Sequence, residues 1–356
     1  MWARELIDWF RVNQRSMPWR ENVSPYYTLI SEFMAQQTQI ITVIPYFNQW
    51  IQKFPTIEAV ANASEDSILK SWEGLGYYSR ARNLHKTAKI ICNRLNGKIP
   101  NNEKALQKLP GIGPYIAAAV ASIAFNETTA VVDGNVLRVI TRFFGIKDDI
   151  TKDQTKEKVK KRLDQIIKTV PPSDFNQGLM ELGALICKPK SPKCMDCPIS
   201  DMCYAKNMNE IERIPVKPKK EKIPHYTIVV GIIKRVSDQK VLITKRKSNQ
   251  LLGGLWEFPG GKVNDNETLE LALQREIKEE VNLDIKINSF LCKVNHAYSH
   301  FKITMHAYLC NVETDQGLEI KSAENHCWID NTEFDSFAFP KANKVIIQNL
   351  TNNISN

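Results

Sequence analysis

The sequence predicts a multidomain protein in which an all-α first domain, ending in a cysteine-rich loop, is joined by a linker to an α+β second domain. Three observations support this prediction. A chain of 356 residues can bury two separate cores. Apolar residues recur at helical spacing before the cysteines, and alternating apolar and polar residues, typical of strands, follow them. We place the domains at residues 1–210 and 225–356, with the linker at 211–224.

Composition and charge narrow the class of protein. Hydrophobic residues make up 43% of the chain and charged residues 24%, as in soluble globular proteins. No apolar run approaches the length of a membrane span, and the opening MWARELIDWF lacks a signal-peptide pattern, so we expect an intracellular, cytoplasmic protein that does not bind membranes. A net charge of +9 favours a polyanionic partner, although basic proteins with other partners are common.

Apolar spacing predicts the first helices. Leu6, Trp9 and Phe10 indicate an amphipathic opening helix, and residues 26–47 indicate a largely apolar one that contains Glu32. A buried carboxylate must be paired or neutralised. Desolvation raises its pKa toward the range that a general acid needs at neutral pH. The alternative is that Glu32 lies on a solvated edge of the helix.

Farther along, two helices are predicted to meet at residues 74–76, where glycines interrupt the apolar pattern. Tyr77 follows this joint and is itself followed by arginines and lysines. Aromatic side chains beside basic ones suit a stacked, negatively charged polymer. The alternative is an aromatic core with a solvated basic face. Two more helices are expected at residues 151–168, with a basic face, and 175–186, with an apolar side.

The stretch of residues 109–139 predicts a hairpin that leads into a helix. Gly111 and Gly113 permit a tight turn and close backbone approach, and Pro114 suits the first turn of a helix. The first amides of that helix have no intrahelical partner, so they form an anion site that fits a phosphate. Asp133 follows a short apolar run that would hold it at the edge of a core; the alternative is that it only caps a helix.

Four of the eight cysteines form a compact cluster with the spacing C-x6-C-x2-C-x5-C, namely Cys187, Cys194, Cys197 and Cys203. Four thiolates in one loop can bind a tetrahedral zinc ion or an iron–sulfur cluster, and the spacing alone leaves both open. A disulfide is disfavoured in a cytoplasmic chain. The other four cysteines are scattered and are expected to be core thiols.

The linker and the second domain follow. Residues 211–224 contain three prolines and many charges without an apolar period, which predicts an extended connector. In the second domain, Glu276, Glu279 and Glu280 are spaced to share one helix face. The alternative for these carboxylates is an ordinary surface helix of mixed charge.

The first domain resembles the helix-hairpin-helix DNA glycosylases, and among them the adenine DNA glycosylase family, also called the MutY family. The resemblance rests on LPGIGPYIAAAV with VVDGN downstream, on SEFMAQQTQ and on GLGYYSRARNLH. It implies that the hairpin at Gly111 and Gly113 binds the DNA backbone, that Glu32 is the catalytic acid, and that Asp133 acts on the deoxyribose. Asn135 and Tyr115 are implied as hydrogen-bond partners.

The same resemblance carries further implications for DNA contacts. Trp19 and Arg20 would form pocket walls, Gln36 and Gln37 would approach the flipped base and its neighbours, and Tyr77 would wedge beside the lesion. Relatives that also cut the strand carry a Schiff-base Lys where this chain has Tyr115, so the implied reaction is base removal only. One departure is Ala35, where the family usually has Leu. Any wedging role should therefore be weaker here or belong to Gln37 and Tyr77.

The cysteine pattern resembles the loop that carries a four-iron, four-sulfur cluster in endonuclease III and the adenine glycosylases. It implies that Cys187, Cys194, Cys197 and Cys203 hold this cofactor, whose role is to order a loop that presents lysines to DNA. The second domain resembles the Nudix fold, with a box running from Gly261 to Leu283 in which Asn282 replaces the final glycine. Tyr298, Ser299 and His300 are similar to the Phe-Ser-His loop that reads 8-oxoguanine in the family.

The expected function is therefore base excision repair by a monomeric DNA glycosylase that removes adenine mispaired with 8-oxoguanine or guanine in duplex DNA. Three alternatives stay open. One is a nucleotide pyrophosphohydrolase that uses the Nudix box, with the first domain as a DNA tether. Another is a redox-sensing DNA-binding module without enzymatic activity. The third is a glycosylase for thymine or a damaged pyrimidine.

Overall fold

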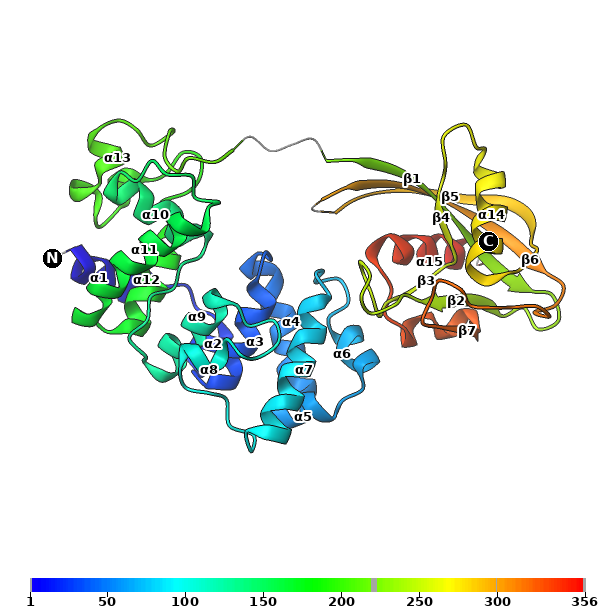
Figure 1. Cartoon of the computed structure of the whole chain (residues 1–356), viewed down its shortest axis with the longest axis horizontal. Coiled ribbons are helices and arrows are strands. Elements are labelled where there is room, and N and C mark those ends of the chain that lie inside the picture. Colours follow the sequence, from blue (N-terminus) through cyan, green and yellow to red (C-terminus); the bar gives the residue numbers. More distant parts are fainter. Residues whose placement is uncertain (1, 219–222, 299, 355–356) are drawn as a thin grey trace. The chain divides into compact units, whose positions relative to one another are not determined.

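The computed structural model describes residues 2–218, 223–298 and 300–354, and the chain divides into two compact units. The first comprises residues 1–62 and 83–220, and the second comprises residues 63–82 and 221–356. Helices build the first unit, whereas the second contains a mixed sheet with helices on both faces (Figure 1). The predicted fold class is confirmed. No helix in the described part of the chain is both long and apolar enough to cross a membrane.

The helices of the first unit are joined by short loops, and three 3-10 turns lie among them. Their bounds are α1 (Trp2–Asn13), α2 (Pro18–Glu21), α3 (Pro25–Ala35), α4 (Ile40–Lys53), α5 (Ile57–Asn62), α7 (Ser79–Arg94), α8 (Glu103–Leu106), α9 (Pro114–Phe125), α10 (Gly134–Phe144), α11 (Asp153–Ile166), η1 (Ile167–Thr169), α12 (Pro172–Leu185), η2 (Cys194–Asp196), η3 (Ser200–Met202) and α13 (Tyr204–Asn207). Helix α7 begins in the second unit, because the boundary between the units falls after Arg82.

Helices α1, α10 and α12 share one hydrophobic core. Phe175, Leu179 and Leu182 are spaced along one side of α12, as the sequence predicts, and they pack with Leu6 of α1 and Ile140 of α10. All five side chains are completely buried. Burying each of them contributes roughly 1.5–3 kcal/mol. This core fixes the position of α10 relative to α12, and both helices carry charged groups of the site described below.

The hairpin before α9 needs glycine at one of its two positions. Gly111 has a φ of +76°, and a Cβ there would lie 2.6 Å from the Cβ of Asn83. At Gly113, by contrast, the backbone does not require glycine. Its φ is −80°, and nothing lies within 4 Å of a Cβ placed there. It is the N-cap of α9 and has no side chain to cap the helix. The open space beside it leaves the first amides of α9 accessible to an anion.

The sequence predicted an extended connector over residues 211–224, but its first part packs against the first unit. Ile214 is buried, and the amide of Ile150 donates to the carbonyl of Val216 at 3.1 Å. The guanidinium of Arg142 donates to the carbonyls of Ile214 and Ile211. This segment has no periodic apolar pattern, and its backbone carbonyls are bound by the side chain of Arg142. Local sequence patterns do not reveal such a long-range contact.

The sheet of the second unit has the strand order β3-β2-β1-β6-β5, with β4 pairing to β1 and β7 to β2. Strands β1 and β6 are parallel, and the other pairs are antiparallel. The bounds are α6 (Glu65–Ser71), β1 (His225–Arg235), β2 (Val241–Lys245), β3 (Trp256–Glu257), β4 (Gly260–Lys262), α14 (Leu269–Val281), β5 (Lys286–Ala297), β6 (Lys302–Val312), β7 (Asn325–Ile329), η4 (Asn331–Ser336) and α15 (Lys341–Ile354).

Both faces of this sheet are covered. Successive side chains of a strand point to opposite faces, so Val229 and Ile233 of β1 join the core beneath α14, whereas Val230 and Ile232 join the core beneath α15. Within the same unit, the loop after α6 contributes Glu73, which is almost fully buried. Its carboxylate accepts hydrogen bonds from Lys70, from Lys344 and from the amide of Phe339.

Candidate active site

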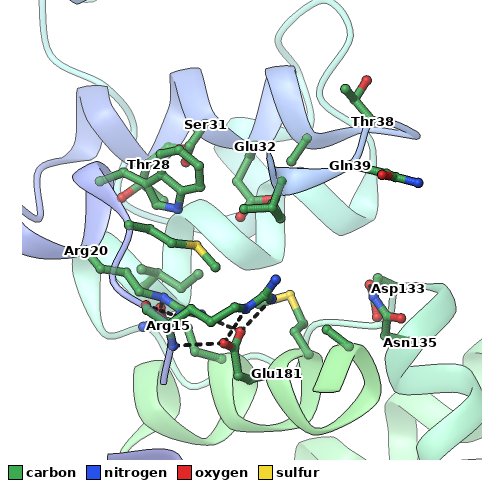
Figure 2. Close-up of a pocket in the computed structure, with 18 of the residues that line it drawn as sticks. Arg15, Arg20, Thr28, Ser31, Glu32, Thr38, Gln39, Asp133, Asn135 and Glu181 are labelled. Carbon is green, nitrogen blue, oxygen red and sulfur yellow. Dashed lines mark hydrogen bonds and ion pairs between the residues drawn. The ribbon is translucent and has the colours of Figure 1, made fainter. Parts of the chain in front are cut away.

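A cavity of about 470 Å³ lies in the first unit, where α2, α3, α9, α10 and α12 meet (Figure 2). Three carboxylates from distant parts of the chain line it, together with two arginines and the tyrosine that follows the hairpin: Glu32, Asp133, Glu181, Arg15, Arg20 and Tyr115. Glu32 and Asp133, which the sequence proposed as an acid and its anionic partner, therefore face one shared cavity.

Glu32 is buried on α3 rather than on a solvated edge. Helix α3 begins cleanly because Ser24 caps it, accepting a hydrogen bond from the amide of Tyr27, and Pro25 fills its first turn. Burial raises the pKa of Glu32 to about 7; the nearby hydroxyl of Tyr115 opposes this rise, and the charge of Asp133 adds to it. Oε2 of Glu32 has no hydrogen-bond partner among the described residues. A buried acid that is half protonated near neutral pH can donate a proton to a ligand.

Asp133 both caps a helix and lines the cavity, so the two interpretations of this residue are compatible. As N-cap of α10, its Oδ1 accepts from the amide of Val136 at 2.6 Å, and its Oδ2 accepts from the side-chain amide of Asn135 at 2.9 Å. Burial raises its pKa, while these hydrogen bonds and the charge of Arg138 oppose the rise. These donors favour the charged form of the carboxyl and so oppose the effect of burial.

Asn135 reaches this position because α12 carries a glycine opposite it. A Cβ on Gly183 would lie 2.6 Å from the Cβ of Asn135, so any larger residue would push α10 away from α12. Oδ1 of Asn135 also accepts a hydrogen bond from Nη2 of Arg138 at 2.9 Å. The side chain that orients Asp133 is thus held from both sides.

Tyr115 is the third predicted residue that the fold brings to the cavity. It stands in the first turn of α9, directly after the hairpin. Burial, together with the charges of Glu32 and Asp133, keeps its pKa well above the ordinary value, so the phenol stays protonated. A neutral hydroxyl can hydrogen-bond to either carboxylate but cannot act as an amine nucleophile.

An ionic cluster that the sequence did not predict lies at the base of the cavity. Glu181 of α12 is buried and accepts from the backbone amide, Nε and Nη2 of Arg15, at 3.0, 2.7 and 3.0 Å. Nη2 of Arg20 donates to the same carboxylate at 3.1 Å (Figure 2). Burial would raise the pKa of Glu181, but these donors lower it below the ordinary value. The sequence feature that could have predicted Glu181 is a carboxylate on the apolar side of a helix, the same feature that identified Glu32.

The remaining predicted DNA-contact residues are placed as follows. Trp19 and Arg20 line the cavity, as expected. Gln36 and Gln37 lie in the loop after α3, and the cavity wall there is formed by their neighbours Ala35 and Thr38. Gln37 has a φ of +56°, a left-handed conformation that is uncommon outside glycine.

In the second unit, Tyr77 lies in the loop between α6 and α7 and has a φ of +50°.

The carboxylates of the Nudix box, also in the second unit, accept hydrogen bonds from other groups of the chain. Arg275 contacts Glu267, Glu276 and Glu279. Glu280 accepts from the amide of Gly260 and the hydroxyl of Ser322.

The proposed 8-oxoguanine loop also belongs to the second unit. Tyr298 stacks on Phe301 with ring centroids 4.8 Å apart, and its amide donates to the carbonyl of Phe301 at 2.8 Å. His300 is exposed. Ser299 lies outside the described residues, so its predicted contact to the base has no structural description.

The four clustered cysteines follow α12 and line one small cavity of about 30 Å³ together with Arg142. Four thiols that line one cavity are the donor set that an iron–sulfur cluster requires. Arg142 supports this loop: its guanidinium donates to the carbonyls of Lys188 and Pro189, and Nη1 lies 3.4 Å from Sγ of Cys187.

Helix α10 connects this loop to the catalytic cavity. Arg138, one turn before Arg142, donates through Nε to the carbonyl of Cys187 at 2.7 Å and through Nη2 to Asn135. Asn135 in turn donates to Asp133. A displacement of the cysteine loop would therefore move the carboxylate of Asp133 through the side chains of Arg138 and Asn135.

A helical domain with a glycine hairpin, a cavity that Glu32 and Asp133 both face, and a four-cysteine loop defines a helix-hairpin-helix DNA glycosylase. Family models agree: residues 30–165 match the HhH-GPD superfamily of base excision DNA repair proteins, residues 187–203 the iron-sulfur binding domain of endonuclease III, and residues 229–349 the NUDIX domain. The chain belongs to the adenine DNA glycosylase family.

Two relatives show the membership. The adenine DNA glycosylase of Rattus norvegicus is 32% identical over 399 residues, covering 97% of this chain and 77% of the relative. That of Buchnera aphidicola subsp. Schizaphis graminum is 32% identical over 358 residues, covering 98% of each chain. Among solved structures, a thermostable thymine-DNA glycosylase is 32% identical with a TM-score of 0.51, and it covers 58% of this chain and 95% of its own.

The cofactor of this family is a four-iron, four-sulfur cluster, and the loop at residues 187–203 is the segment that matches an iron–sulfur domain. Cys187, Cys194, Cys197 and Cys203 would hold it through their thiolates. With all four of these ligands supplied by protein thiolates, the cluster would organise the loop and would leave no open position for a substrate.

Proposed function

We propose that this protein, acting as a monomer, hydrolyses the N-glycosidic bond of adenine mispaired with 8-oxoguanine or guanine in duplex DNA. The observation that carries the proposal is the shared cavity of Glu32 and Asp133. The pKa of Glu32 is raised to about 7 by burial; burial also raises the pKa of Asp133, but the hydrogen bonds from Val136 and Asn135 oppose that rise and favour its charged form. Two carboxyl groups in different environments can divide the roles of acid and anion.

The proposed reaction begins when adenine leaves the base stack, at a cost of a few kcal/mol. Glu32 donates its proton to a ring nitrogen of the purine, and the bond between the base and the sugar breaks with its electron pair leaving on the base. Positive charge then develops on the deoxyribose, as in glycoside hydrolysis, and the carboxylate of Asp133 stabilises it. Glu32, now ionised, accepts a proton from the water that adds to the sugar.

Base recognition is assigned to the floor of the cavity. The carboxylate of Glu181 accepts hydrogen bonds from the amide, Nε and Nη2 of Arg15 and from Nη2 of Arg20, so both of its oxygens are satisfied within the chain. Its part in the proposal is to hold these two arginine side chains at the cavity floor, beside the position of the base.

The cavity also favours base removal without strand cleavage. Its described lining contains arginines but no lysine, and Tyr115 stands at the position where a Schiff base would have to form. Arginine and protonated tyrosine do not supply a free amine. We therefore assign a monofunctional reaction in which water is the nucleophile.

Recognition of the opposite base is assigned to the second unit. Tyr298 is anchored by its stack on Phe301 and by a backbone hydrogen bond, and the exposed His300 follows it closely. An anchored aromatic ring beside exposed polar groups suits the edge of an oxidised purine.

The proposed substrate is tested with single-turnover assays on duplexes that carry adenine opposite 8-oxoguanine, guanine or thymine. We expect adenine release to be fastest opposite 8-oxoguanine, slower opposite guanine and negligible opposite thymine. A duplex with thymine opposite guanine is the matched control for pyrimidine release. Thymine release without adenine release would contradict the proposal, as would strand breaks formed before alkali treatment.

The pH dependence of the single-turnover rate should report Glu32. Its pKa is raised to about 7, so the protonated, active form predominates below that value and is lost as pH rises through it. We expect the rate to fall about tenfold per pH unit above the midpoint. Enzyme must saturate the duplex at every pH, with binding measured in parallel. A rate that stays constant from about pH 6 to about 8.5 would contradict the assignment of this acid.

A further inference from the structure

Two exposed apolar side chains stand on the rim of the catalytic cavity. Val23, in the loop between α2 and α3, has a relative exposure of 56%, and Ile41, in the first turn of α4, has 75%. Both contribute to the lining of the cavity that contains Glu32 and Asp133. A single exposed apolar residue needs no explanation. Two of them on the rim of one cavity that also holds three carboxylates indicate a surface that is covered when the substrate binds.

The chain path brings Ile41 to this rim. Helix α3 ends at Ala35, and the amide of Thr38 donates to the carbonyl of Ala35 at 3.1 Å, closing a turn. Gln37 adopts its left-handed conformation inside that turn. The turn places the start of α4 beside the end of α3, so Ala35 and Ile41 line the same cavity. Ala35 offers one methyl group there, whereas Ile41 offers a branched side chain.

We propose that Ile41 is the apolar wedge that enters the base stack when adenine moves into the cavity, taking the part for which Ala35 is too short. The inference rests on the proposed function. Its occupant is the base-pair step next to the extruded adenine, because the rim is continuous with the cavity that would receive the base. Apolar side chains such as Ile and Leu are inserted between base steps by many DNA-binding proteins. A β-branched residue is stiff at χ1 and suits this use.

The wedge is tested by comparing Ile41→Ala, Ile41→Val and the double variant Ala35→Leu/Ile41→Ala with the parental holoprotein. The single-turnover rate of adenine release is measured on a duplex with adenine opposite 8-oxoguanine. Base extrusion is followed by the fluorescence of 2-aminopurine placed at the adenine position. We expect Ile41→Ala to slow both by about 10- to 100-fold. Ile41→Val should stay near the parental rate, and Leu at position 35 should restore most of the loss.

Two controls separate a wedge from a structural role. Val12 on α1 is 84% exposed and does not line the cavity, so Val12→Ala should leave both rates unchanged. On a duplex whose adenine lies in an unpaired bubble, the defect of Ile41→Ala should shrink, because less extrusion is needed. An unchanged defect on the bubble, a parental rate for Ile41→Ala, or no rescue by Leu at position 35 would overturn the wedge alone. Failure of the parental protein to release adenine would overturn the proposed function with it.

Discussion

Glu32→Gln is expected to slow adenine release by about 10²–10⁴-fold while DNA binding stays close to the parental value. The amide matches the shape of the buried carboxyl but cannot transfer an acidic proton to the purine. Single-turnover excision measures the first effect, and titration of a duplex with adenine opposite 8-oxoguanine measures the second. Excision at the parental rate would show that another group is the acid.

The same variant should be more stable than the parental protein at alkaline pH. Because burial raises the pKa of Glu32 from 4.5 to about 7, the folded state resists ionisation of this group. The stability associated with the protonated form is complete below pH 4.5 and is lost as pH rises to about 7. Above that range, Glu32→Gln should gain on the order of 3 kcal/mol in free energy of unfolding. Glu157→Gln, on the exposed side of α11, is the matched control and should change neither stability nor excision.

Arg142→Met is expected to lose the iron–sulfur cluster and to destabilise the first unit. The guanidinium donates to four backbone carbonyls and approaches one thiol, and the residue is buried. Methionine fills part of the volume but leaves those carbonyls without donors, at a cost on the order of 3–5 kcal/mol in total. Iron content, the visible absorbance of the cluster and the midpoint of thermal unfolding measure the effect.

Arg162→Met provides the control for loss of a positive charge in the same region. Arg162 is exposed, and its guanidinium lies 4.3 Å from the ring centroid of Phe144, so its removal should cost about 1 kcal/mol or less. Iron content should stay complete in this variant. If Arg142→Met keeps its full iron content and unfolds at the parental temperature, the carbonyl contacts do not hold the loop.

Much of the fold followed from short-range patterns. Helical spacing identified the apolar side of α12, and cysteine spacing located the metal loop. Each of these signals depends on residues close together in the chain. The linker was predicted less completely, since nothing local in residues 211–216 shows that Arg142, about 70 positions earlier, binds their carbonyls.

The site divides in the same way. The motif around Glu32 and the segment around Asp133 nominated an acid and an anion through their resemblance to the glycosylase family. Whether Glu32 was buried or solvated, and whether the two residues faced one cavity, depended on how α3, α9 and α10 pack. Of the ionic cluster, only Arg20 was predicted, as a pocket wall. Its pairing with Glu181, and that of Arg15, was not predicted, because these residues are 161 and 166 positions apart in the chain.

Residue order alone was therefore sufficient to name the chemistry available to this chain: a carboxyl on an apolar helix, an aspartate after a glycine hairpin and four clustered thiols. Only the packing of the helices established the pKa of Glu32, the orientation of Asp133 through Asn135, and the rim on which Ile41 stands. The physical reason is that desolvation and hydrogen bonding act over a few ångströms in space. Those distances depend on which helices pack together, as α10 and α12 do at Gly183. Residues that are adjacent in the sequence do not determine that packing.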